Sequence, residues 1–63
     1  MPLYRCCFLD RTRNAFQMQS VACENDAEAI MMAQRMTVNN GAAGFELWRD
    51  ERCVHIETPA GAV

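Results

Sequence analysis

The chain has 63 residues, of which 51% are hydrophobic, and its formal net charge is −2. A chain this short forms one domain at most, and it buries only about 60% of its unfolded surface. The negative charge argues against a surface that neutralises phosphates, and no apolar run approaches the roughly 20 residues of a membrane helix. We therefore expect neither a nucleic acid nor a membrane as a partner.

Cysteine usage and the first residues favour a cytoplasmic protein. Met1 is not followed by a basic and then apolar leader of the kind that directs secretion. The four cysteines are therefore expected to be reduced thiols rather than disulfides. A domain of this size without disulfides usually gains stability from a metal or from oligomerisation.

Two β-type segments, residues 3–9 and 15–23, open the chain and flank a polar turn. A turn of three residues, 11–13, predicts that Phe8 lies opposite Phe16 and that Cys6 lies opposite Met18. An even-numbered turn would pair Phe8 with Gln17 instead. We favour the three-residue turn because it gathers apolar side chains on one face, namely Tyr4, Cys6, Phe8, Phe16 and Met18.

The alternation of the second segment breaks after Ser20. Val21 and Cys23 fall on the opposite parity from Phe16 and Met18. A β-bulge, which is one extra residue in a strand, would restore a common apolar face. We therefore predict a bulge near Ser20.

A helix is predicted over residues 26–39. Asn25, followed three residues later by Glu28, fits a capping box, and Asn40-Gly41 supplies a left-handed stop. The stripe expected to face the sheet contains Ala29, Ile30, Ala33, Met36 and Thr37. A second apolar stripe, about 120° away around the helix, contains Ala27, Met31 and Val38.

Residues 45–48 and 53–56 predict two further strands, joined through a two-residue turn at 50–51. That turn pairs Trp48 with Cys53 and Glu46 with His55. The core face of this hairpin is then expected to hold Phe45, Leu47, Val54 and Ile56.

These elements predict a single α+β domain over residues 1–57, with a flexible tail at 58–63. The sheet is four-stranded and mostly antiparallel, with one helix on one face, in the chain order strand, strand, helix, strand, strand. The spatial strand order 2-1-3-4 keeps every neighbouring pair antiparallel. The most buried residues are expected to be Phe8, Phe16, Ile30, Ala33, Phe45, Leu47, Val54 and Ile56.

No second helix is available to cover the other face of the predicted sheet. That face is expected to mix polar and apolar side chains: Arg5, Cys7, Leu9, Gln17, Gln19, Glu46, Trp48, Cys53 and His55. A homodimer, the commonest assembly, would cover one such patch with its copy. We expect the interface either on this face, around Trp48 with Cys7, Leu9, Cys53 and His55, or on the second helix stripe of Ala27, Met31 and Val38.

No residue pattern predicts a catalytic, cofactor-binding or metal site. Cys6 and Cys7 are adjacent, so their side chains point to opposite faces of a strand, and the Cys-x-x-Cys spacing typical of zinc does not occur. His55, the one histidine, is expected to form a cross-strand pair with Glu46 rather than to activate a cysteine. A thiol- or metal-dependent protein built on Cys6, Cys7, Cys23 and Cys53 is the alternative.

Three stretches carry a resemblance to a known group: residues 4–10, residues 23–30, and Glu46-Leu47-Trp48 with Val54-His55. The chain resembles small uncharacterised ββαββ proteins of rhizobial and related alphaproteobacteria, and more distantly the N-terminal part of HicB-type antitoxins. It lacks the glycine-rich strand end of the antitoxins and an appended DNA-binding domain. The resemblance implies the fold and a bacterial origin, and it implies no activity.

The leading hypothesis from the sequence is a non-enzymatic, cytoplasmic, self-associating module for interaction or regulation. Its basis is the high apolar content of a chain with little interior, together with a sheet face that no helix covers.

Overall fold

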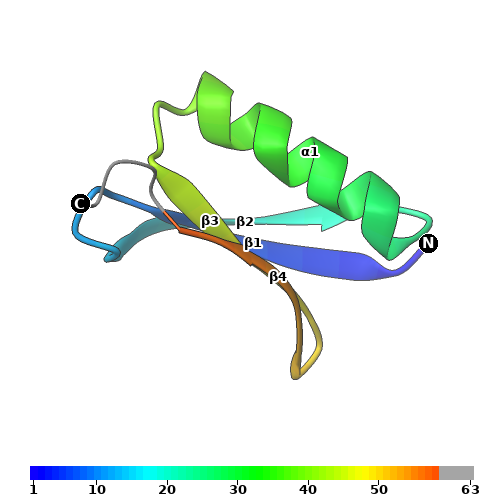
Figure 1. Ribbon diagram of the computed structural model, residues 1–63. Helices are drawn as coiled ribbons and strands as arrows, with labels where there is room; N and C mark the ends of the chain where they lie inside the picture. Colours follow the sequence, from blue (N-terminus) through cyan, green and yellow to red (C-terminus); the bar gives the residue numbers. More distant parts are fainter. Residues whose placement is uncertain (59–63) are drawn as a thin grey trace.

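A computed structural model describes residues 1–58 and shows an α+β fold with a four-stranded antiparallel sheet and one helix. The elements are β1 (Leu3–Leu9), β2 (Ala15–Ala22), α1 (Asp26–Asn39), β3 (Gly44–Arg49) and β4 (Arg52–Glu57). The strand order is β2-β1-β3-β4 with every neighbouring pair antiparallel, which confirms the predicted order. Helix α1 covers one side of the sheet (Figure 1). The predicted flexible tail, apart from Thr58, lies outside the described residues.

Helix α1 begins and ends where its capping residues predict. The side chain of Asn25 accepts a hydrogen bond of 2.8 Å from the Glu28 N–H, which is the first half of a capping box. At the other end, the Asn40 N–H donates to the Met36 carbonyl at 2.9 Å, and Gly41 adopts a φ of +67°. Glycine takes this left-handed conformation without the steric penalty of a side chain.

The core lies between α1 and the central strands β1 and β3. Small residues on the buried stripe of the helix, Ala29, Ala33 and Thr37, face the sheet, and the Thr37 hydroxyl donates to the Ala33 carbonyl at 2.7 Å. The fully buried side chains of the sheet side are Tyr4, Cys6, Phe8, Cys23, Phe45 and Leu47. Ile30 and Val54, predicted among the most buried residues, are only partly buried.

The β1–β2 turn has the predicted three-residue length. The Asp10 carboxylate accepts hydrogen bonds from the Thr12 and Asn14 N–H groups and from the Thr12 hydroxyl, at 2.6–3.0 Å. The Asp10 N–H donates to the Asn14 carbonyl at 2.9 Å, and Arg13 has a φ of 70°. A left-handed residue at the end of a three-residue loop is the usual arrangement for such hairpins.

A β-bulge follows this turn immediately, and it overturns the predicted register. Leu9 pairs with Ala15 but Phe8 pairs with Gln17, so Phe16 is the extra residue. The predicted pairs of Phe8 with Phe16 and of Cys6 with Met18 are therefore wrong, because Cys6 pairs with Gln19.

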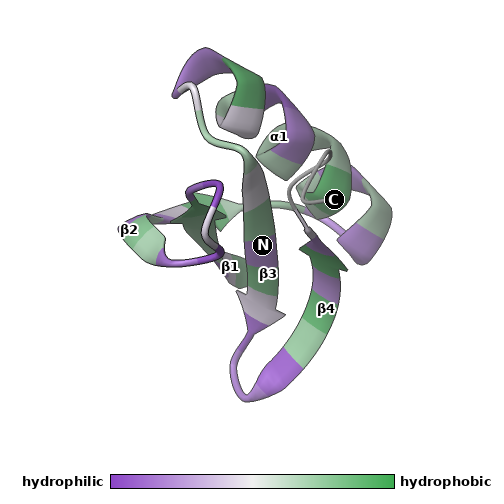
Figure 2. Ribbon diagram, turned by 60° about the vertical axis from the view of Figure 1, so that its left-hand side comes forward, coloured by the Kyte–Doolittle hydropathy of each residue, from purple (hydrophilic) through white to green (hydrophobic). Residues whose placement is uncertain are grey.

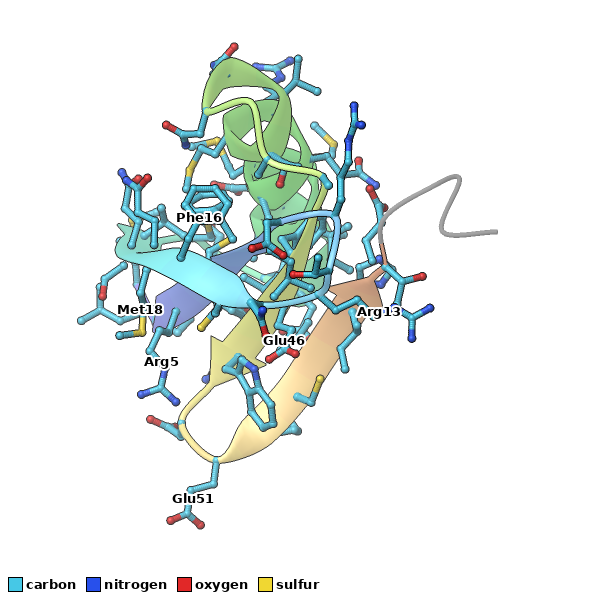
Figure 3. All side chains as sticks on the ribbon, turned by 90° about the vertical axis from the view of Figure 1, so that its left-hand side faces the viewer. Arg5, Arg13, Phe16, Met18, Glu46 and Glu51 are labelled. Atoms are coloured by element: carbon cyan, nitrogen blue, oxygen red, sulfur yellow. The ribbon has the colours of Figure 1, made fainter. Side chains whose placement is uncertain are left out.

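The predicted bulge near Ser20 is also wrong, since the bulge lies at Phe16. It brings Val21 and Cys23 to the core, and Phe16 and Met18 are left 51% and 60% exposed. Phe16 lies beside the α1–β3 connection, where it lines a shallow hollow with residues 41–43 (Figure 3).

The β3–β4 hairpin likewise has a turn of the predicted length followed by a bulge. Its two-residue turn forms as predicted, with Asp50 at a φ of 55° and Trp48 opposite Cys53. A register shift between Leu47 and Trp48 then makes Val54 the extra residue of β4, so Leu47 pairs with His55.

This second bulge reverses the expected faces of β4 beyond Val54. Glu46 pairs with Ile56 rather than His55, and Phe45 pairs with Glu57 rather than Ile56. Ile56 is 49% exposed, so its predicted place in the core is wrong. His55 lies on the helix side instead, with its ring centroid 5.6 Å from that of Phe45.

Candidate interaction surface

The side of the sheet away from α1 forms a surface that no described element covers, which we call the open face. Because side chains alternate along a strand, the register assigns to it Leu3, Arg5, Cys7, Met18, Ser20, Glu46, Trp48, Cys53 and Ile56. Two rows cross all four strands: Ser20, Arg5, Trp48 and Cys53 in one, and Met18, Cys7, Glu46 and Ile56 in the other. Figure 3 shows Arg5 and Met18 on this side of the sheet and Phe16 on the helix side.

The open face carries large apolar side chains in contact with solvent. Leu3, Met18 and Ile56 are 66%, 60% and 49% exposed, and Cys53 is exposed beside Trp48. These residues come from three of the four strands and from both ends of the face. Exposed apolar side chains gathered on one face are typical of an interaction site, and here Arg5 and Glu46 lie among them on the central strands.

Trp48 lies in the interior of this face and its ring is held in place. The indole Nε1–H donates to the Glu46 carboxylate at 3.2 Å, and the side chain is half-buried. Arg5 lies opposite Trp48 on the neighbouring strand. A tryptophan with its one polar group already satisfied presents an apolar ring that a partner can cover without loss of a hydrogen bond.

Of the residues predicted for an interface on this face, the structure brings Cys7, Trp48 and Cys53 together on it. Leu9 is 3% exposed, so it has no surface to offer a partner, and His55 lies on the opposite side of the sheet. Three residues that sequence reasoning missed complete the face, namely Leu3, Met18 and Ile56. Two of them, Met18 and Ile56, reach it because of the bulges.

The second helix stripe is a separate apolar surface. Ala27, Met31 and Val38 are all exposed, as predicted for a stripe that does not face the sheet, and Val38 is 78% exposed. Met31 and Val38 border a shallow hollow together with polar side chains of the same helix, Gln34, Arg35 and Asn39. This stripe carries no aromatic residue.

A polar cluster ties the helix start to both hairpins. The Tyr4 hydroxyl donates to the Asp26 carboxylate at 2.7 Å, and the Arg52 guanidinium lies 3.2 Å from the same carboxylate. The hydrogen bond from Tyr4 is the main cause that lowers the pKa of Asp26, and it raises the pKa of Tyr4. The Arg49 guanidinium lies 5.9 Å from the centre of the Tyr4 ring. The cluster fixes the helix to the sheet.

The four cysteines are free thiols in the structure, and they do not form a common site. In the described residues 1–58, no three His, Cys, Asp or Glu side chains are grouped as metal ligands. Burial raises the pKa of the Cys6 thiol to about 11 and also raises the pKa of Cys7 and of Cys23. The thiolate is the reactive form, so burial suppresses the reactivity of these three.

We expect a thiol reagent at about pH 8 to modify Cys53 quickly and the other three cysteines slowly. Cys53 is exposed, whereas Cys6 is fully buried and, with a pKa of about 11, is ionised in only about one molecule in a thousand. Titration with a chromogenic disulfide, on the native chain and on its Cys53→Ser variant, measures this. Four fast thiols are expected in denaturant. Modification of native Cys6 or Cys23 as fast as Cys53 would instead favour a thiol-dependent function.

Comparisons of the chain with protein-family models, with curated proteins and with solved structures find no significant match. The surface therefore has to be interpreted from its own geometry, and the resemblance to small ββαββ proteins stays a prediction. Among residues 1–58, no helix has the length and apolar character needed to cross a membrane.

Proposed function

We propose that the protein is a non-enzymatic, self-associating interaction module of the bacterial cytoplasm, and that a homodimer buries its open face. The observation that carries this proposal is the set of exposed apolar side chains on a sheet face that no described element covers, Leu3, Met18 and Ile56 around the half-buried Trp48. A two-fold axis brings the same patch of each copy together.

Burial of these side chains supplies the driving force. Full burial of an exposed large apolar side chain contributes about 1.5–3 kcal/mol, and a side chain that is already half-buried gains a correspondingly smaller share. Trp48, Met18 and Ile56 occupy β3, β2 and β4, so that one partner face would cover all three at once. Association costs about 4–15 kcal/mol in lost freedom, which means that several such residues must be buried together.

The open face is a better interface than the second helix stripe for two reasons. It contains Trp48, and aromatic side chains dominate interface energetics, while the stripe of Ala27, Met31 and Val38 has none. The face is also part of a sheet, and two sheets pack face to face at about 10 Å with interdigitating side chains.

The rival class, a thiol- or metal-dependent protein, has less support. The raised pKa values of Cys6, Cys7 and Cys23 disfavour a reactive thiolate at neutral pH. Cys7 and Cys53 share the open face, but each is paired in register with a different residue, Glu46 and Trp48 respectively.

Replacement of Trp48 with Glu is expected to disrupt the open-face contact and so to weaken association, because it places a charge at the centre of the buried face. Size-exclusion chromatography at a fixed loading concentration measures the change. Two controls belong with it. Trp48→Phe keeps an apolar ring and should remain a dimer, and Met31→Glu should remain a dimer because it alters only the helix stripe. Weakened association of Met31→Glu together with wild-type association of Trp48→Glu would transfer the interface to the helix.

A further inference from the structure

Strand β2 is an edge strand, and none of residues 1–58 pairs with its outer side. It is bonded only to β1, and it forms one margin of the sheet while β4 forms the other (Figure 2). Seven of its eight residues are exposed, all except Val21. The unpaired N–H and C=O groups of an edge strand are a template for pairing with another chain.

Edge strands that must stay unpaired usually carry charges, a proline or an interrupting bulge. Strand β2 is Ala-Phe-Gln-Met-Gln-Ser-Val-Ala, which has no charged residue and no proline. Its bulge at Phe16 lies near the start and leaves residues 17–22 in regular register. The other edge, β4, also has no proline, but it contains Arg52, His55 and Glu57, and its bulge at Val54 lies in the middle.

The direction of the backbone groups on β2 follows from one hydrogen bond. The Cys23 N–H donates to the Pro2 carbonyl at 3.1 Å, one step beyond the pair of Leu3 with Ala22. Bonded and non-bonded pairs alternate in an antiparallel ladder. The backbone groups of residues 17, 19 and 21 therefore face β1, while those of Met18, Ser20 and Ala22 point away from it.

We propose that a second copy of this chain adds to the outer side of β2 in antiparallel orientation, with the two-fold axis at Ser20. In that register Ser20 pairs with Ser20 of the copy, and Met18 pairs with Ala22. All three outward residues then bond, which makes about six backbone hydrogen bonds between the copies. The two sheets become one sheet of eight strands.

Two copies of the β2 edge can approach each other because the features that usually prevent such pairing are missing. No like charges meet, because residues 15–22 are uncharged. Helix α1 packs against β3 and β1, so it leaves the edge free. The two-fold axis is perpendicular to the sheet, which keeps both helices on one side and both open faces on the other.

This inference deepens the proposed self-association by naming a contact that uses backbone groups of β2 rather than the open face. The two contacts are separable, because the edge pair leaves the open faces uncovered. A measurement that resolves individual residues can therefore show that the edge pair is absent without deciding whether the open-face contact forms.

Amide hydrogen exchange of the wild-type chain, followed by NMR at increasing protein concentration, tests the edge pairing. At low concentration, Gln19 and Val21 should be protected, while Met18, Ser20 and Ala22 exchange quickly. At high concentration the latter three should slow by about tenfold or more. The Trp48→Glu variant should show the same slowing, since it leaves the edge intact. Fast exchange of Ser20 at every concentration would overturn the edge pairing, whatever happens to the open face.

A pair of variants at Ser20 tests the same contact through its outward N–H. Ser20→Pro removes this N–H, and proline is tolerated on an edge strand where the N–H faces solvent. It should weaken association by about tenfold or more, while Ser20→Ala, which keeps the N–H, should associate like the wild type. Equal association of folded Ser20→Pro and Ser20→Ala would contradict the proposal. If Ser20→Pro does not fold, the exchange experiment decides.

Discussion

Replacement of Phe8 with Ala is expected to lower the free energy of unfolding by about 3–5 kcal/mol, the range for a fully buried aromatic residue. Phe8 is 0% exposed near the end of the central strand β1, in the cluster between the sheet and α1. The whole stability of a chain of this length is about 3–9 kcal/mol, at roughly 0.05–0.15 kcal/mol per residue. The variant is therefore expected to be largely unfolded at 25 °C or close to it.

Phe16→Ala is the matched control for this prediction. It makes the same chemical change in the facing strand, but Phe16 is the bulge residue and is 51% exposed. We expect it to cost under about 1 kcal/mol, as surface substitutions usually do. Urea titrations of both variants, followed by circular dichroism, measure the difference. Equal losses of stability would mean that Phe16 packs opposite Phe8 in a ladder without the bulge.

Replacement of Leu47 with Ala should cost about 2–5 kcal/mol, because Leu47 is fully buried on β3 beneath the helix. The reason is the same as for Phe8: the lost side chain leaves a cavity that the neighbouring residues cannot fill completely. Thermal unfolding monitored by circular dichroism gives the loss as a lowered midpoint.

Ile56→Ala is the control in the neighbouring strand. Ile56 is 49% exposed on the open face, so we expect a loss under about 1 kcal/mol for the monomer. Both variants are measured at a concentration where the chain is monomeric, because dimer formation would add its own stabilisation. A loss for Ile56→Ala as large as that for Leu47→Ala would place Ile56 in the core and remove the bulge at Val54.

The element boundaries could be predicted because local signals determine them, and the strand order because it is the one that keeps every neighbouring pair antiparallel. Asn25 and Gly41 set the ends of α1 through hydrogen bonding and backbone conformation, and these act over a few residues. The lengths of both hairpin turns were also correct. Asp10 accepts three hydrogen bonds within its own turn, which makes that turn a local property of the chain.

The registers beyond the turns could not be predicted, because each depends on where an extra residue is inserted. Val21 and Cys23 have odd residue numbers, whereas Phe16 and Met18 have even ones. This difference indicates that β2 contains a bulge, but it does not indicate where the bulge lies. The structure inserts it at Phe16, which buries Cys23 and Val21 and leaves Met18 exposed. Nothing in the sequence indicates the bulge at Val54.

Only part of the candidate interface could be predicted, because the bulges change which residues of β2 and β4 face each side of the sheet. The register shifts do not change the positions of Trp48, Cys7 and Cys53, which lie on the face where the alternation places them. Met18, Ile56 and His55 lie beyond a bulge, so each is found on the opposite side of the sheet from its expected place. The result is an open face that is more apolar than expected. It gains Met18 and Ile56 and loses His55, Gln17 and Gln19.

The proposal that this chain associates with itself is tested most directly by sedimentation equilibrium of the wild-type protein from low to high micromolar concentration. The monomer has a mass of 7.1 kDa. We predict that the weight-average mass rises with concentration to at least twice this value, and that the Trp48→Glu and Ser20→Pro variants each weaken the rise. A wild-type chain that stays at the monomer mass throughout the range would contradict self-association through either surface.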